Sequence, residues 1–160
     1  MITAIRIQDL RGIRFGGVEG LSPLSVLVGP NGCCKSTILD ALLLGASGAL
    51  GDAVGRVISR RVELWGAARW LFWRGGRTEE PTATIHLETA DAPARDVTLR
   101  LLTDVSTVLE EKLVASRARA PYTEIEATLV RGEAKLVSRT AVAYGQNSYV
   151  FKQDGPRELK

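Results

Sequence analysis

The sequence predicts an α/β fold in which a mixed sheet carries a phosphate-binding loop, and three observations support this prediction. Residues 24–28 form a continuous apolar run, which is typical of a buried parallel strand. Residues 35–44 follow a glycine-rich segment and are apolar on nearly every side, so we expect a buried helix. Beyond residue 79 the chain becomes rich in β-forming residues, which indicates a β-rich arm.

The first half of the chain contains four further expected elements. Residues 2–8 alternate in polarity and predict a strand, and residues 13–15 are expected to pair back on it after a short break. Residues 52–61 and 64–73 favour two helices, and the adjacent glycines Gly75 and Gly76 close this region.

The second half is expected to consist of strands separated by turns, with one helix between them. Turn residues at 91–93 and 131–133 mark two hairpins. The expected strands cover residues 82–89, 96–103, 122–130, 134–143 and 148–152, and the expected helix covers residues 106–119.

Length and composition narrow the class of protein. The 160 residues suffice for one domain with a core, and 45% hydrophobic with 24% charged residues is the globular range. A net charge of +3 is too small to indicate nucleic-acid binding by itself. No apolar run is long enough for a transmembrane helix, and the amino terminus does not resemble a signal peptide. Two adjacent cysteines, Cys33 and Cys34, cannot form a disulfide framework, so we expect a cytoplasmic protein without a membrane span.

The segment from Gly29 to Thr37 carries the clearest chemistry. Gly29, Lys35 and Ser36 match the pattern G-x-x-x-x-G-K-[ST] between an expected strand and an expected helix. In such a loop, successive backbone N–H groups surround phosphates, and the helix amino terminus adds partial positive charge. We expect Lys35 to reach the outer phosphates and the Ser36 hydroxyl to hold Mg²⁺.

Cys34 departs from the pattern, because it stands where the second glycine belongs. Glycine is tolerated where φ is positive, whereas a side chain in the left-handed region costs roughly 1–2 kcal/mol. Two interpretations stay open: a weakened nucleotide site, or a loop that no longer binds nucleotide. A redox role for the thiols is disfavoured, because a disulfide between neighbours would distort the loop.

The loop Gly29-Pro30-Asn31-Gly32 followed by Lys35-Ser36-Thr37 resembles the Walker A loop of ABC-type ATPases, a branch of the P-loop NTPases. Residues 5–13 and the helix 36–42 resemble the RecF/SMC branch, including the OLD-family ATPases; the specific resemblance covers residues 1–48. It implies ATP and Mg²⁺ as ligands. The implied binding residues are Gly29, Pro30, Asn31, Gly32, Cys33, Cys34, Lys35, Ser36 and Thr37.

The resemblance also implies roles outside the loop. Arg11 corresponds to an arginine near the nucleotide phosphates, although a solvated loop arginine is the plain alternative. A glutamine after the β-rich arm would contact the metal and the γ-phosphate. Gln146 and Gln153 are the candidates, and for each of them a plain surface glutamine is the favoured interpretation.

Several parts of an ABC-type site are absent from the sequence. We find no signature loop, no Walker B strand ending in Asp-Glu and no switch histidine, since His86 is expected on the polar face of a strand. We therefore interpret residues 1–78 as a nucleotide-binding core and residues 79–160 as the β-rich arm of the same lobe. A carboxyl-terminal half and a second head would complete the ATPase, so the expected partner is a homo-oligomer or a completing chain.

The expected helices in residues 52–78 combine six arginines with four aromatic residues. Three interpretations stay open: core packing with solvated arginines, a protein interface, or contact with single-stranded DNA. The sequence thus predicts an ATP-binding head whose dimerisation controls a DNA-directed or effector activity. The alternatives are a pseudo-ATPase scaffold that holds a partner and a nucleic-acid-binding module.

Overall fold

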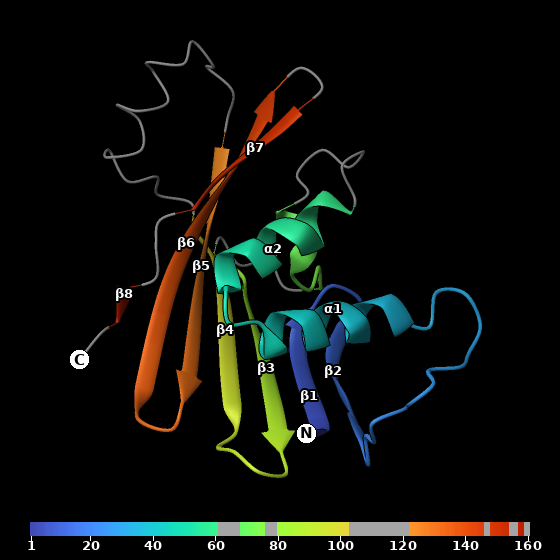
Figure 1. Cartoon of the computed structure of the whole chain (residues 1–160). Coiled ribbons are helices and arrows are strands. Elements are labelled where there is room, and N and C mark those ends of the chain that lie inside the picture. The colour runs from blue at the N-terminus through green and yellow to red at the C-terminus, as the bar shows by residue number, and fades with distance from the viewer. Residues whose placement is uncertain (61–67, 76–79, 103–121, 146–147, 154–156, 159–160) are drawn as a thin grey trace.

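A computed structural model describes residues 1–60, 68–75, 80–102, 122–145, 148–153 and 157–158. In the described residues, one twisted sheet supports two helices on a single face (Figure 1). The strands are β1 (Ile2–Leu10), β2 (Ile13–Glu19), β3 (Thr82–Thr89), β4 (Arg95–Leu102), β5 (Tyr122–Arg131), β6 (Ala134–Gly145), β7 (Ser148–Gln153) and β8 (Arg157–Glu158). The helices are α1 (Lys35–Ala46), α2 (Leu50–Ser59) and the short 3₁₀ helix η1 (Arg69–Leu71).

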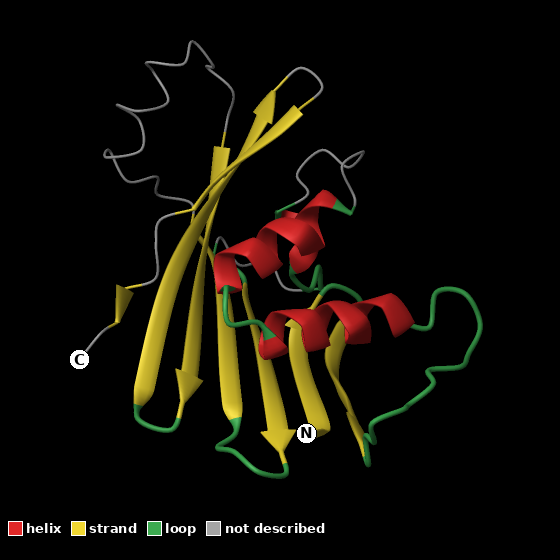
Figure 2. Ribbon diagram, in the orientation of Figure 1, coloured by secondary structure: helices red, strands yellow, loops and turns green. Residues whose placement is uncertain are grey.

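The sheet is antiparallel at every described pairing. Its strand order is β2-β1-β3-β4-β5-β6-β7, and β8 pairs with β6. Figure 2 shows the strands in yellow and the helices in red. The alternation of apolar and polar residues explains this arrangement: Ile85 and Leu87 are buried, whereas Thr84 is exposed. One face of the sheet therefore forms the core and the other is solvated, as is common for antiparallel sheets.

Helix α1 lies close against β3 because Gly45 has no side chain. A Cβ atom at this position would come within 2.5 Å of Leu87 Cδ1. Arg95 of β4 holds the same end of the helix, since its guanidinium donates to the carbonyls of Ala46 at 2.8 Å and Ser47 at 2.7 Å. Burial, together with the charge of Arg131, lowers the pKa of Arg95. These contacts fix the carboxyl end of α1 against the sheet.

The predicted α/β fold with a mixed sheet, of the P-loop NTPase type, is wrong. The described chain is mostly β-structure with two α-helices, and none of its described strand pairs is parallel. Residues 24–28, the expected buried parallel strand, form no strand. Leu24, Val26 and Val28 are 83%, 76% and 88% exposed. The physical reason is that an apolar run becomes a buried strand only where a neighbouring strand pairs with it. The composition of residues 24–28 cannot show whether such a neighbour exists.

Most of the other expected elements are confirmed. The expected strands correspond to β1 to β7, and the helix expected at 52–61 corresponds to α2. Of the helix expected at 64–73, the described part contains only η1, and the helix expected at 106–119 lies outside the described residues. In the part of the chain that the structure describes, no helix is long and apolar enough to cross a bilayer.

Candidate phosphate-binding site

The loop before α1 turns tightly, and the backbone amides of the first helical turn make no hydrogen bond within the helix. Gly32 has a φ of 84°, and Cys34, the N-cap residue, has φ 63° and ψ 13°, both in the left-handed region. Thus Cys34 occupies the backbone conformation that the motif reserves for glycine. The cap makes no side-chain hydrogen bond, and the first intrahelical bond of α1 runs from Ile38 N to Cys34 O at 3.1 Å. The amides of residues 35–37 are therefore placed as anion donors.

Lys35 folds back over this loop. Its Nζ donates to the carbonyl oxygens of Gly29 and Pro30, each at 2.7 Å, and lies 3.5 Å from Cys33 Sγ. Both carbonyls are neutral, so these contacts hold the ammonium in place without cancelling its charge. A second source of positive potential thus lies beside the amino end of α1.

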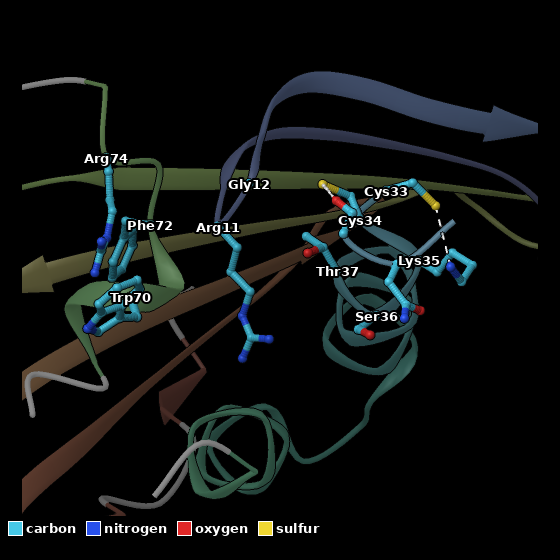
Figure 3. A pocket seen from close by; sticks show the side chains of 12 residues that line it. Arg11, Gly12, Cys33, Cys34, Lys35, Ser36, Thr37, Trp70, Phe72 and Arg74 are labelled. Carbon is cyan, nitrogen blue, oxygen red and sulfur yellow. Dashed lines mark hydrogen bonds between the residues drawn. The ribbon is translucent and has the colours of Figure 1, made fainter. Parts of the chain in front are cut away.

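An open cleft of about 450 Å³ runs beside the loop (Figure 3). The loop and the start of α1 form one side, and η1 with the segment that follows it forms the other. The lining residues are Arg11, Gly12, Asn31, Gly32, Cys33, Cys34, Lys35, Ser36, Thr37, Trp70, Phe72 and Arg74. The structure therefore brings most of the predicted site residues to one cleft.

Arg11 lines this cleft but also has a structural role. Its Nη1 donates to Asp40 Oδ2 at 2.5 Å and its Nη2 donates to the carbonyl of Val57 at 2.9 Å. Only 9% of the Arg11 side chain is exposed. Arg60 reaches the other oxygen of Asp40 at 3.2 Å. The Arg11 guanidinium thus ties the β1–β2 turn to both helices, and a direct phosphate contact stays a prediction.

The remaining predicted residues are less informative. Ser36 is exposed in the first turn of α1, where a hydroxyl can reach a bound ion, whereas Thr37 is buried. Gln146 lies outside the described residues; the backbone of Gln153 pairs with Thr140, but its side chain is not described. No group of three potential metal-ligating side chains occurs among the described residues.

His86 lies on the solvated face of the sheet, as its sequence context predicted. Its Nδ1 is 2.7 Å from Asp96 Oδ1. It does not line the cleft.

Sequence reasoning missed the second wall of the cleft. Trp70, Phe72 and Arg74 belong to the basic aromatic region of residues 52–78, which the sequence did not connect with the phosphate loop. Backbone contacts far apart in sequence make that connection: Arg11 N donates to Leu71 O at 3.0 Å, and Trp73 N donates to Asp9 O at 2.7 Å. No local pattern in the sequence indicates such a pairing.

Comparison with known proteins adds one weak likeness. No protein-family model matches the chain, and no solved structure matches it. An uncharacterized protein of Methanocaldococcus jannaschii is 38% identical over 65 residues. The match covers 41% of this chain and 30% of that relative.

Proposed function

We propose that this chain binds a nucleoside triphosphate, ATP with Mg²⁺, through the segment Gly29–Thr37. The observation that carries the proposal is that the Lys35 ammonium and the amino end of α1, with no side-chain cap, line the same cleft. Fixed backbone donors and a lysine are the groups that polyphosphates require. The sequence motif in this segment supports the same ligand.

The chemistry of the site follows from these groups. The amides of residues 35–37 donate to phosphate oxygens, and Lys35 exchanges its two carbonyl contacts for the outer phosphates. Mg²⁺ commonly keeps several waters and takes one or two protein ligands together with phosphate oxygens. The exposed hydroxyl of Ser36 suits that limited demand, so the residues present fit a magnesium ion carried by the nucleotide.

A second candidate function is a scaffold that binds nucleotide weakly and serves to hold a partner. Two observations favour it. Cys34 adopts a left-handed conformation that is strained for a side chain, and Arg11 is engaged by Asp40. The strain at Cys34 costs the loop free energy, and the ion pair with Asp40 occupies the Arg11 guanidinium. Affinity for nucleotide separates this candidate from the first.

We further propose that the protein acts in the cytoplasm, in keeping with its two free thiols, which disulfide-forming compartments would tend to oxidise. Pairing of two copies, or of this chain with a completing chain, would couple nucleotide binding to a DNA-directed or effector activity. The exposed apolar side chains of Leu24, Val26, Val28 and Leu39 support such a contact.

Calorimetric titration with Mg·ATP tests the proposed ligand. Lys35→Ala is expected to weaken binding at least about tenfold, because one charge-assisted contact contributes about 1.5–3 kcal/mol. Lys135→Ala, which removes an exposed lysine from β6, is the matched control and leaves the dissociation constant unchanged. Equal affinity of the Lys35 and Lys135 variants, with intact circular dichroism, removes the proposal.

A further inference from the structure

The end of the cleft away from the phosphate loop is aromatic. Trp70 is half-buried there, and the guanidinium of Arg74 lies over its indole ring. Phe72, which is buried, lines the cleft beside them. Figure 3 shows this group on one side, the loop on the other and Arg11 between them. The cleft therefore has a cationic end and a flat, stacked end.

The stacked end is held in place before any ligand arrives. Leu10 and Phe72 form an antiparallel bridge, and Phe72 N donates to Arg69 O at 3.2 Å. The bridge and the hydrogen bonds of Arg11 N and Trp73 N attach the segment to β1 and the β1–β2 turn. A platform of this kind needs little ordering on binding, which favours affinity.

We propose that Trp70 and Arg74 form the platform for the nucleobase of the nucleotide whose phosphates bind at Gly29–Thr37. This inference rests on the proposed function and specifies its ligand class: a nucleotide recognised through the face of its base. Indole rings and guanidinium planes both stack on bases, and every base offers a π face. The platform therefore distinguishes nucleotides from inorganic polyphosphates, while it discriminates little between adenine and guanine.

The dimensions of the cleft favour a single nucleotide over a nucleic-acid strand. A cleft of about 450 Å³ lies within the range of small-molecule sites. A strand would require a basic groove that continues past the platform. Phosphate donors and stacking groups here line one cleft, as a nucleotide with a single polyphosphate requires.

The test compares Mg·ATP, Mg·GTP and magnesium tripolyphosphate on the full chain. Trp70→Ala is expected to weaken ATP binding at least about fivefold, the lower range for loss of one base stack, and to leave tripolyphosphate affinity within about twofold. Trp70→Phe retains a stacking surface and recovers most of the affinity for ATP. Wild-type protein binds ATP and GTP within about threefold of each other, because stacking does not read base edges.

Arg74→Ala is the second variant, and because Arg74 is exposed, its removal is compatible with folding. Arg74→Ala is also expected to weaken the binding of ATP and to leave the binding of tripolyphosphate unchanged. Arg56→Ala removes an exposed arginine of α2 that does not line the cleft, and it leaves both affinities unchanged.

Distinct results overturn each proposal. The proposed platform is wrong if ATP affinity is unchanged in both Trp70→Ala and Arg74→Ala. It is equally wrong if these variants lose affinity for tripolyphosphate as much as for ATP. It is also wrong if an oligothymidylate binds through Trp70 without competition from tripolyphosphate. If wild-type protein binds neither ATP nor tripolyphosphate, the proposed function fails and the platform fails with it. If tripolyphosphate binds through Lys35 but ATP gains nothing from Trp70, only the platform fails.

Discussion

Arg11 and Asp40 form a buried ion pair, with 2.5 Å between Nη1 and Oδ2 and only 9% and 3% of the two side chains exposed. The pair joins the turn after β1 to the first half of α1, and so fixes the helix whose amino end forms the candidate site. Removal of Asp40 would take its carboxylate away from the buried Arg11 guanidinium and from Arg60.

The first prediction follows from this pair. Asp40→Ala is expected to lower the free energy of unfolding by about 3–5 kcal/mol, as for other buried pairs that lose one member. Asp52→Ala, which removes an exposed acid from α2, is the control and is expected to change stability by less than about 0.5 kcal/mol. Urea denaturation followed by circular dichroism measures both. A loss no greater than that of the control would show that the pair does not hold α1.

The second prediction concerns the left-handed residue of the loop. Cys34→Gly is expected to stabilise the protein by about 1 kcal/mol and to tighten Mg·ATP binding, because the backbone strain at φ 63° is relieved. Cys34→Ala keeps the strain and is the matched control. Thermal denaturation and calorimetry check the two effects. A glycine variant that is no more stable than the alanine variant would contradict the strain argument.

The third prediction uses the exposed thiol of Cys33, which lies 3.5 Å from Lys35 Nζ. In a Cys34→Ala background, iodoacetamide reacts with this single thiol, and a ligand on the loop should shield it. At ten times its dissociation constant, Mg·ATP is expected to slow alkylation about tenfold by mass action. Mass spectrometry of quenched samples gives the rate. An unaltered rate at saturating nucleotide would place the ligand away from Cys33.

The fourth prediction concerns the apolar run before the loop. Because Leu24, Val26 and Val28 are largely exposed, we expect the chain to self-associate at high concentration. Val28→Asp is expected to shift sedimentation-velocity profiles toward the monomer. Ala134→Asp adds the same charge at an exposed site on β6 and has no such effect. If the wild-type chain stays monomeric throughout the concentration series, this surface is not a self-association site.

The strands were predictable because their signal is local. Residues such as Thr84, Ile85, His86 and Leu87 alternate in polarity, and the alternation alone places one side of β3 in the core. The helix α1 and the need for a left-handed residue at Cys34 were predictable for the same reason, since a motif of adjacent residues specifies both.

The errors come from information that is not local. Residues 24–28 have the composition of a buried strand, but burial depends on a neighbour that the run itself does not encode. Nor does the local sequence indicate that an aspartate 29 residues after Arg11 engages its guanidinium. Likewise, long-range backbone pairs set the approach of Trp70 to the loop.

The most direct test of phosphate binding at Gly29–Thr37 is to follow backbone amide resonances of the labelled 160-residue chain during titration with Mg·ATP. We predict that the largest chemical-shift changes fall on the amides from Gly32 to Thr37, and that Lys35→Ala reduces them at equal ligand concentration. Changes concentrated elsewhere on the sheet, or unperturbed loop amides in the presence of saturating ligand, would contradict it.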